Sequence, residues 1–413
     1  MAGPGSYLIG EEEKKNLLEV IEAGWLYRYA DASAANFKAK VLQLEQELAQ
    51  YIGIKRVVAV NSGTAALFVA LAALGIGPGD EVIVPGYTFI ASIGSIVYSR
   101  AVPILAEIDE SLTLDPRDVR KKITKRTKAI MLVHMLGNPG HIDQIRSLAQ
   151  EHNLQLVEDC AQAFGATYKG KSVGVYGDIG TFSFNFYKTI TAGDGGAVVM
   201  KDEDLYRRAF AVHDQGHLPL RDGVEQGSRA LLGLNFKMTE LTAAVLLAQL
   251  KKVDALTKKL KEKKSRFKDG IKDISGLTFR TLPEPQGEVG TLLTVFLPNA
   301  DIARRVGDEL GCGVVADSGW HVYNNMEHVL GKKVVDSVGC PFTCPYYTNN
   351  GGKVNYEIGM LPQTDSILSR AINISVGVSD AGLGSGFGIS ILSDNDEIDA
   401  KAEQFRKCVK KHL

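Results

Sequence analysis

Lys188 stands in a short polar turn between two segments whose composition predicts buried strands. The run from Gly180 to Phe186 is apolar, β-branched and aromatic, and a second apolar run, Ala197 to Met200, follows a glycine-rich turn. Burying an ammonium group is costly, so a lysine held between buried strands is expected to have a chemical task. Its amine could form a Schiff base with an aldehyde. A solvated surface lysine is the usual alternative, so this hypothesis depends on the rest of the chain.

Asp159 follows a predicted strand, Gln155 to Glu158, and supplies a carboxylate that Schiff-base chemistry at Lys188 could also use. Side chains alternate along a strand, so Glu158 and Asp159 should point in opposite directions and not act as a pair. A carboxylate at the strand's end could keep a pyridine nitrogen protonated, as pyridoxal 5′-phosphate (PLP) requires to act as an electron sink. Gln162 could hydrogen-bond the phenolic oxygen of that ring. A helix N-cap is the competing interpretation of Asp159.

Two further turns supply groups for a phosphate and a ring. Gly63 and Thr64 lie in a strand-to-helix turn, where backbone N–H groups and the helix dipole favour an anion, although a plain N-cap explains the same residues. Ser183, five residues before Lys188, could place its hydroxyl on the same phosphate. Phe89 follows another predicted strand and could stack on the ring, with a place in the core as the alternative.

Together these segments resemble the DegT/StrS-type family of sugar aminotransferases, which are PLP enzymes of the aspartate aminotransferase fold. The resemblance extends from about Gly10 to the C-terminus and is strongest in NSGTAAL, VPGYTFIAS, LVEDCAQAFG, FSFNFYKTITAGDGGAVV and GLNFKMTELTAAV. It implies that Lys188 is the Schiff-base lysine and that Asp159 contacts the pyridine nitrogen. The other cofactor residues that it implies are Gln162 at the phenolic oxygen, Phe89 on the ring, and Gly63, Thr64 and Ser183 at the phosphate.

The resemblance also implies an assembly and a reaction type. Asn235 matches an asparagine that reaches the phosphate of the neighbouring subunit, which implies a homodimer with shared active sites. Lys237 replaces an arginine that is usual in the family, so a bidentate contact there is in doubt. Related sugar 3-dehydratases carry histidine at the position of Lys188, so lysine here favours transamination.

The implied reaction moves an amine from a glutamate-like donor to a keto sugar by a ping-pong aldimine mechanism, in the biosynthesis of lipopolysaccharide or antibiotic sugars. Several blocks look closest to the branch that makes 8-amino-3,8-dideoxy-octulosonate, and a nucleotide-linked keto sugar is the other acceptor considered. A PLP-dependent lyase, racemase or dehydratase, or a non-catalytic homologue, are the alternatives. The candidate substrate-facing residues are Arg28, His213, His217, His321, Tyr323 and Arg370, each with a structural role as its alternative.

Strands alternate with helices of similar length through the first half of the chain, which predicts an α/β fold with a large, mostly parallel sheet. Short strands and two helices after Leu277 predict a smaller α+β domain, so we expect a large domain over residues 1–268 and a small one over 269–413. Four local predictions accompany this division: a mobile arm at residues 1–10, a loop at 215–230, one long helix from Met238 to about Lys272, and a strand from Val314 to Ala316. The glycine run from Gly382 to Gly388 lacks the context of a nucleotide fingerprint and is interpreted as a flexible loop near the site entrance.

Composition excludes several classes of protein. The 413 residues carry a formal net charge of −1, so no basic surface indicates nucleic acid or anionic membrane. No apolar run is long enough to span a bilayer, and no secretory signal is seen, so we expect a cytoplasmic protein. The five cysteines suggest reduced thiols, and the one close pair, Cys340 and Cys344, has no second ligand pair for zinc, so no metal is expected.

Overall fold

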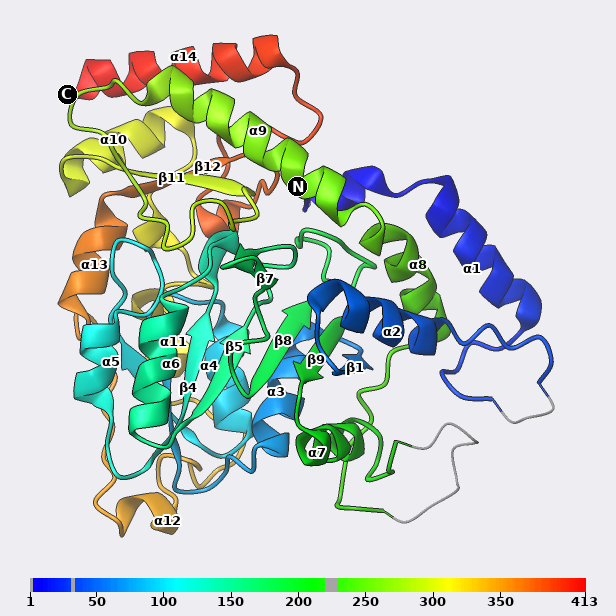
Figure 1. The fold of residues 1–413 in the computed structure, drawn as a ribbon. Coiled ribbons are helices and arrows are strands. Elements are labelled where there is room, and N and C mark those ends of the chain that lie inside the picture. The colour runs from blue at the N-terminus through cyan, green and yellow to red at the C-terminus, as the bar shows by residue number, and fades with distance from the viewer. Residues whose placement is uncertain (1–2, 31–33, 220–228) are drawn as a thin grey trace.

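A seven-stranded, mostly parallel sheet forms the centre of the molecule (Figure 1). The computed structural model describes residues 3–30, 34–219 and 229–413. The strand order is β1-β9-β8-β5-β4-β2-β3, and β9 runs antiparallel to its two neighbours. The strands are β1 (Arg56–Val60), β2 (Glu81–Pro85), β3 (Val102–Ala106), β4 (Thr127–Val133), β5 (Gln155–Asp159), β8 (Ile179–Ser183) and β9 (Gly196–Met200). The predicted α/β class is therefore confirmed.

Both faces of this sheet are buried, as its continuous apolar strands require. Side chains alternate between the faces: Val82 and Val84 belong to one hydrophobic cluster, and Ile83 between them belongs to the other. The helices of one face are α2 (Lys40–Ile52), α5 (Pro116–Lys122) and α6 (Ile142–Glu151), and those of the other are α3 (Gly63–Ala73), α4 (Ile90–Tyr98) and α7 (Glu203–His213).

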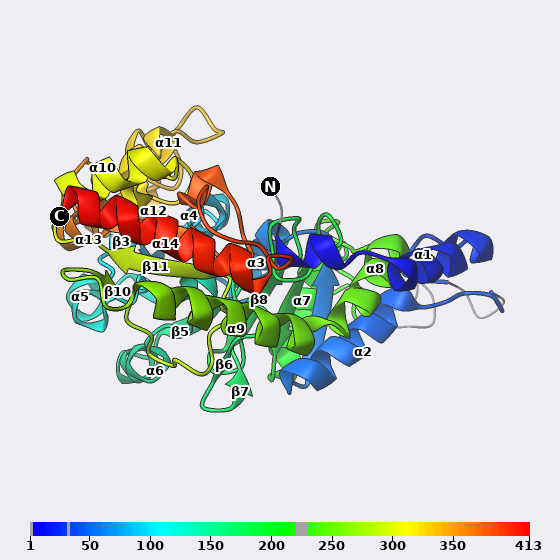
Figure 2. The same cartoon turned by 90° about the horizontal axis from the view of Figure 1, so that it is seen from above.

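A second, three-stranded antiparallel sheet lies beside the first, in the order β10-β11-β12. Its strands are β10 (Thr278–Phe279), β11 (Leu292–Phe296) and β12 (Ala371–Ser375). Helix α9 (Val253–Ile271) packs against α14 (Asn395–His412), and α14 against α10 (Ala300–Leu310), as seen from two directions in Figures 1 and 2. Because α9 runs through residues 268 and 269, the proposed domain boundary falls inside a helix, and it stays a prediction.

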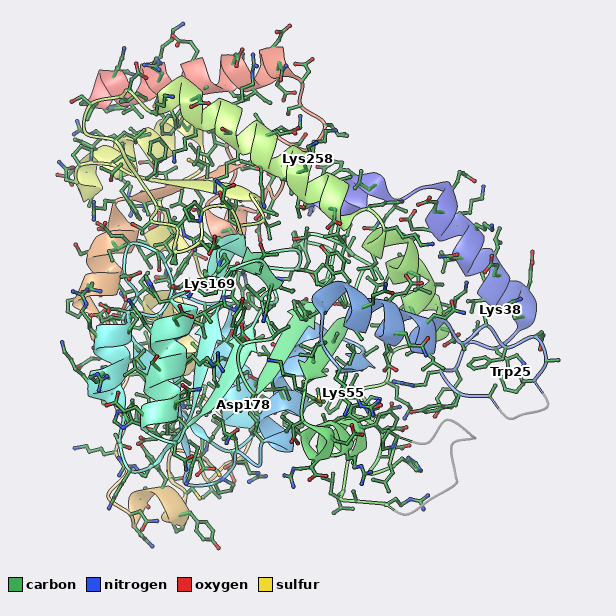
Figure 3. The ribbon with its side chains drawn as sticks, viewed as in Figure 1. Trp25, Lys38, Lys55, Lys169, Asp178 and Lys258 are labelled. Carbon is green, nitrogen blue, oxygen red and sulfur yellow. The ribbon has the colours of Figure 1, made fainter. Side chains whose placement is uncertain are left out.

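The remaining elements are short or peripheral. They are η1 (Pro4–Leu8), α1 (Glu11–Ala23), η2 (Met135–Gly137), β6 (Thr167–Tyr168), β7 (Lys171–Ser172), α8 (Glu240–Leu250), η3 (Val315–Asp317), η4 (Tyr323–Asn325), α11 (Glu327–Leu330), α12 (Pro345–Thr348), α13 (Pro362–Ser369) and η5 (Ala381–Leu383). The segment between α1 and α2 carries Trp25 at one end of the molecule, and Lys258 lies on α9 (Figure 3). Within the described ranges, no helix combines the length and apolarity that a bilayer crossing needs.

Three local predictions are wrong. The predicted helix from Met238 to Lys272 is two helices, α8 and α9, which are separated by a turn at Lys251 and Lys252. Residues 315–317 form a 3₁₀ helix where a strand was expected. The N-terminal residues from Gly3 onward pack against the chain around Lys188, where a mobile arm was expected. Residues 1–2 and 220–228, the latter in the predicted loop, lie outside the described residues.

Candidate active site

Lys188 lies in the turn that joins β8 to β9, and it lines a cavity of about 400 Å³. The two sides of this turn continue the antiparallel pairing of the strands: Phe184 N–H donates to Gly195 O, and Phe186 N–H donates to Gly193 O, both at 2.9 Å. Gly3 N–H then donates to Phe186 O at 3.0 Å, so the N-terminal segment braces the turn from outside. The backbone that carries Lys188 is therefore held from two directions.

The Lys188 amine lies in an environment that favours its neutral form. Burial lowers its pKa below the ordinary lysine value, and the opposing charges of Asp159 and Asp380 only partly offset this effect. A neutral amine has the free electron pair that a nucleophile or a proton acceptor needs. The amine also lies 5.9 Å from the centroid of the Phe89 ring, which places both residues in one cavity.

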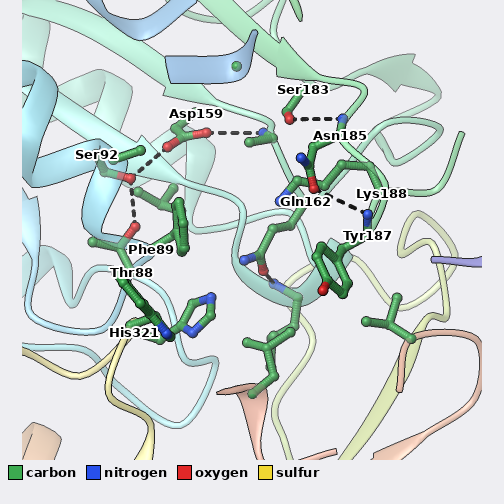
Figure 4. Close-up of a pocket in the computed structure, with 18 of the residues that line it drawn as sticks. Thr88, Phe89, Ser92, Asp159, Gln162, Ser183, Asn185, Tyr187, Lys188 and His321 are labelled. Atoms are coloured by element: carbon green, nitrogen blue, oxygen red, sulfur yellow. Dashed lines mark hydrogen bonds between the residues drawn. The ribbon is translucent and has the colours of Figure 1, made fainter. Parts of the chain in front are cut away.

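Asp159 ends β5 with its carboxylate facing the cavity (Figure 4). Ser92 Oγ donates to its Oδ2 at 2.8 Å, and Ala161 N–H donates to its Oδ1 at 3.0 Å. Thr88 and Ser92 share a further hydroxyl–hydroxyl bond of 2.7 Å. The carboxylate is thus fixed by a helix side chain and by its own loop.

Glu158 points to the other side of the sheet, as the alternation along the strand predicts. Its carboxylate is fully buried and accepts hydrogen bonds from the backbone N–H groups of Gly174, Tyr176 and Gly177, and it lies 3.0 Å from His134 Nε2. These interactions outweigh the effect of burial and keep the pKa of Glu158 below its ordinary value. The prediction that the two adjacent carboxylates do not form a pair is confirmed.

Phe89, Gln162 and His321 also line the cavity. Phe89 is 39% exposed, so it belongs to the cavity wall and not to the core, and its ring lies 5.3 Å from that of His321 between centroids. Gln162 Oε1 accepts from Leu136 N–H at 2.9 Å, which leaves the amide nitrogen to donate to an acceptor in the cavity. Burial, together with the charge of Lys188, lowers the pKa of His321 to about 3, so this imidazole is neutral at physiological pH.

The N-terminus of α3 forms one end of the cavity. Gly63, Thr64 and Ser183 line it together, and Ser62 caps the helix by accepting from Ala65 N–H at 3.0 Å. A Cβ on Gly63 would lie only 2.5 Å from Ser183 Cβ, so the helix and the end of β8 approach this closely because residue 63 has no side chain. Free N–H groups at a helix start and a nearby hydroxyl are the donors that a phosphate monoester requires.

Comparison with known protein families identifies the family to which this site belongs. The model of the DegT/DnrJ/EryC1/StrS aminotransferase family matches residues 8–310, which include every cavity residue described above except His321 and Asp380. The chain belongs to this family. It is an aminotransferase, and its cofactor is PLP.

Individual relatives agree with this assignment. A GDP-perosamine synthase of Vibrio cholerae is 38% identical over 67% of this aminotransferase and 71% of its own length. An L-glutamine:2-deoxy-scyllo-inosose aminotransferase of Streptomyces lividus is also 38% identical, over 64% of this chain and 66% of its own. The crystal structure of 3-amino-5-hydroxybenzoic acid synthase superposes with a TM-score of 0.78 at 27% identity and covers 100% of this chain and 98% of its own. The expected PLP-dependent transferase fold is confirmed.

The cavity of the aminotransferase has the donors and acceptors that PLP needs. A helix N-terminus and small hydroxyl residues stand at one end, suited to the phosphate. A fixed carboxylate, Asp159, stands where a protonated ring nitrogen would find its partner, and the exposed face of Phe89 offers a flat surface to the ring. Lys188 supplies the amine. The residues present therefore fit the cofactor.

Five candidate residues of the aminotransferase lie outside the cavity. They are Arg28, His213, His217, Tyr323 and Arg370. The prediction for Arg28 is wrong, because its side chain is fully buried and contacts Glu45 at 3.0 Å and His213 at 2.9 Å. That for Tyr323 is also wrong, because the side chain is buried and its hydroxyl donates to Asp365 and accepts from Leu361 N–H. His213 is buried beside Arg28, which contradicts its substrate-facing prediction in the same way.

The contacts of three further candidates, Arg370, His217 and Asn235, also lie outside the cavity. Arg370 forms an ion pair of 2.8 Å with Glu110, and this surface contact explains the side chain without a substrate. His217 is buried and interacts with Asp214 O, and Asn235 pairs through its backbone with the same Asp214. The structure thus brings neither His217 nor Asn235 into the cavity of its own chain. The substrate-facing role of His217 and the contact of Asn235 across a dimer stay predictions.

Several cavity residues have no counterpart in the sequence prediction. Ser92 lies one turn into the helix after Phe89, within a block that was recognised, and its spacing could have indicated a partner for Asp159. Trp320 and Asp380 also line the cavity, from segments far along the chain that carry no motif. The glycine run from Gly382 lies next to the site as expected, since Val378, Asp380 and Leu383 line the cavity, although its first residues form the 3₁₀ helix η5.

Proposed function

We propose that the enzyme transfers an amine from a glutamate-like donor to a keto sugar by ping-pong transamination. The observation that carries this proposal is the position of Lys188, whose amine shares one cavity with Asp159, Phe89 and the N-terminus of α3. When bound, PLP supplies an aldehyde that takes up amines and a ring that accepts electrons.

The residues of the chain then have defined tasks. Lys188 would hold the cofactor through its amine, and the same amine would move the proton at the substrate carbon. Its lowered pKa suits this task, because the amine must be neutral to take up a proton. Asp159 carries a negative charge that would keep the ring nitrogen of PLP protonated, and the hydrogen bonds from Ser92 and Ala161 hold its carboxylate in place. Gln162 would donate to the phenolic oxygen through its amide nitrogen, because its amide oxygen already accepts from Leu136 N–H.

The substrate class rests on the relatives. GDP-perosamine synthase and L-glutamine:2-deoxy-scyllo-inosose aminotransferase are named for an amino-sugar product and an oxo-cyclitol acceptor, and the latter for a glutamine donor. Both names support a polyhydroxylated ketone as acceptor and glutamate or glutamine as donor. The 8-keto-octulosonate acceptor suggested by the sequence remains our narrower hypothesis within this class.

We further propose that two chains assemble into a homodimer in which Asn235 contacts the phosphate in the partner's site. Its side chain lies outside the cavity of its own chain, as this role requires. Sedimentation of the purified enzyme would show the dimer, and Asn235→Ala should weaken retention of PLP without changing the fold. A monomer that retains PLP fully would exclude the shared site.

Lys188→Ala tests the catalytic proposal, with Lys258→Ala on the surface of α9 as its control (Figure 3). Lys188→Ala should lose both turnover and the visible absorbance of the lysine-bound cofactor, while its circular dichroism stays unchanged. Incubation of the parent enzyme with glutamate should convert the cofactor to its amine form and leave it there. A lyase or racemase would instead return to the starting absorbance, and near-parental turnover by Lys188→Ala would refute the role of this lysine.

A further inference from the structure

Trp320 offers a largely exposed aromatic face to the cavity. The residue is 58% exposed and lies in a segment that is hydrogen-bonded to the chain on both sides of Phe89. Ile90 N–H donates to Trp320 O at 3.0 Å, and Thr88 N–H donates to His321 O at 2.9 Å. The backbone that carries the indole is therefore held at a fixed position relative to Phe89, the proposed ring-stacking residue. An exposed tryptophan in a binding cavity is costly to leave in water and indicates a ligand with an apolar face.

Asp380 places a carboxylate in the same cavity. Its Oδ1 accepts from Gly382 N–H at 2.8 Å, which fixes the orientation of the group. In the described part of the chain, no hydrogen-bond donor reaches its Oδ2, so this oxygen can accept a bond from a ligand. The charge of Asp380 acts on the Lys188 amine, which places the carboxylate near the reacting group.

The turn at Gly382 joins the two residues into one unit. Gly382 O is hydrogen-bonded to Ser318 Oγ and lies 3.3 Å from His321 Nδ1, so the turn is attached to the segment that carries Trp320. A Cβ on Gly382 would lie 3.1 Å from Asp380 Oδ1 and 3.5 Å from Trp320 Cδ1. The carboxylate of Asp380 and the indole of Trp320 thus both lie against Gly382, and a side chain there would crowd the carboxylate.

From this arrangement we propose that Trp320 and Asp380 form the subsite that recognises the acceptor, with the indole against the C–H face of a polyhydroxylated ketone and the carboxylate accepting its hydroxyl groups. This inference rests on the proposed function. Sugars combine these two surfaces, an apolar face and a rim of hydroxyl donors, and a hydroxyl bonded to a carboxylate makes one of the stronger hydrogen bonds in proteins. Both residues lie beyond residue 310, where the family match ends, so they belong to the part of the chain that can differ between acceptors.

The charges of the cavity favour the acceptor over the donor as the ligand of this subsite. Among the described residues that line the cavity, Lys188 is the one lysine or arginine, against the carboxylates of Asp159, Asp194 and Asp380. Glutamate must bring its α-carboxylate next to the reacting amine, where the carboxylate of Asp380 repels it, whereas an octulosonate or a GDP-linked sugar carries its charge away from the keto carbon. The Asp380 carboxylate can accept hydroxyl groups from a sugar. We therefore expect Asp380 to favour binding of the acceptor and to disfavour binding of glutamate.

The test compares the two half-reactions in Trp320→Leu and Asp380→Asn, with Trp25→Leu and Asp301→Asn as matched controls outside the cavity. Glutamate drives the donor half-reaction, and 8-keto-octulosonate and a GDP-linked 4-keto hexose are the acceptor probes for the return. Each cavity variant should raise the acceptor concentration for half-maximal rate by about tenfold to a hundredfold, the effect of one lost charged hydrogen bond or stacking contact. Trp320→Leu should leave the donor half-reaction within about twofold, and Asp380→Asn should leave it unchanged or improved.

A binding measurement separates this inference from the proposed function. The chain has two tryptophans, so Trp25→Phe leaves Trp320 as the sole indole fluorophore. Without a donor, the keto sugar should quench this fluorescence in the holoenzyme, and Asp380→Asn should shift the midpoint about tenfold upward. Equal losses in both half-reactions, or no fluorescence response to an acceptor that the parent aminates, would overturn the subsite. Failure of the parent to react with either glutamate or glutamine would instead overturn the proposed function.

Discussion

Lys237 forms a buried ion pair whose loss should have a measurable energetic cost. Its Nζ lies 2.6 Å from Asp214 Oδ1, and the two side chains are 5% and 2% exposed. Tyr29 donates its hydroxyl to Asp214 Oδ2 at 2.7 Å. Lys237→Met removes the cation but keeps a side chain of similar length, so a buried carboxylate loses the charge that balances it. Such a loss lowers the free energy of unfolding by about 3–5 kcal/mol. We expect the lower value because Tyr29 still donates a hydrogen bond to the carboxylate.

This cost can be converted into a melting temperature. A chain of 413 residues has an unfolding entropy of roughly 0.9 kcal/mol per kelvin near 60 °C, from the average per residue. A loss of about 3 kcal/mol should therefore lower Tm by about 3–4 °C. Differential scanning calorimetry of the parent and Lys237→Met at neutral pH measures the difference directly.

The dependence on pH gives a second, independent signature of the pair. Burial alone would raise the pKa of Asp214, but the bonds from Lys237 and Tyr29 outweigh it and hold the pKa below the ordinary value of 3.8. The stabilisation by this carboxylate is therefore present above the unfolded-state pKa and is lost as the pH falls through the lower, folded-state value. The gap in Tm between parent and Lys237→Met should be widest near neutrality and should narrow below about pH 4.

Two control variants sharpen the test. Lys237→Arg restores the residue that is usual in the family and keeps the charge, so its Tm should stay within about 1 °C of the parent. Lys258→Met changes an exposed lysine on α9 and should also have little effect. If Lys237→Met melts at the same temperature as Lys258→Met, the buried pair does not stabilise the fold as we reason.

The remaining predictions concern the cavity itself. Gly63→Ala places a Cβ 2.5 Å from Ser183 Cβ, so the N-terminus of α3 and the end of β8 must separate. Equilibrium dialysis should then show PLP binding weakened about tenfold. An unchanged affinity would show that this close approach does not shape the proposed phosphate site. The pKa of His321 is lowered to about 3, so between pH 6.5 and 3 the unfolded chain binds a proton that the folded chain does not. The free energy of unfolding therefore decreases as the pH is lowered through this range. His321→Asn should make the urea midpoint less dependent on pH over this range, and an unchanged slope would show that the folded histidine is protonated.

Most of the residues that we propose to hold the cofactor could be placed from the sequence, because they lie at or after the end of a strand of recognisable composition. Parallel strands bring their carboxyl ends to one edge of a sheet, so Asp159 and Phe89 had to meet there once the strands were recognised. The alternation along β5 also separated Asp159 from Glu158 correctly. A local pattern and a general rule of sheets thus predicted where these side chains lie, while their roles were inferred from the resemblance to the family.

The errors arise where tertiary contacts decide the outcome. Helical periodicity continues through Lys251 and Lys252, with no proline or glycine to mark the turn between α8 and α9. The residues after Gly3 are held by Phe186, some 180 positions away, and no local pattern reports such a contact. Arg28 could not be distinguished from a substrate ligand, because its partner Glu45 is identified only by the fold.

The register of the central sheet sets the geometry of the cofactor site. Asp159 is paired with Thr181 of β8, and its backbone is flanked by the bonds His134 N–H to Asp159 O at 3.0 Å and Cys160 N–H to Thr181 O at 2.9 Å. A shift of one residue would exchange the positions of Asp159 and Glu158 and place the wrong carboxylate in the cavity. The position of Asp159 in the cavity is thus fixed by the pairing of β5 with β8.

The acceptor end has a different physical basis. Trp320 and Asp380 lie on short turns that are joined to each other through Gly382 and to the sheet edge through Thr88 and Ile90. Substitutions in these turns can change a side chain at the cavity without disturbing a strand, because loops tolerate change better than paired strands do. If this division holds, exchanging the two turns with those of a relative should change which ketone is aminated while the reaction with glutamate continues. Loss of the donor reaction in such an exchange would show that the two ends of the site are not independent.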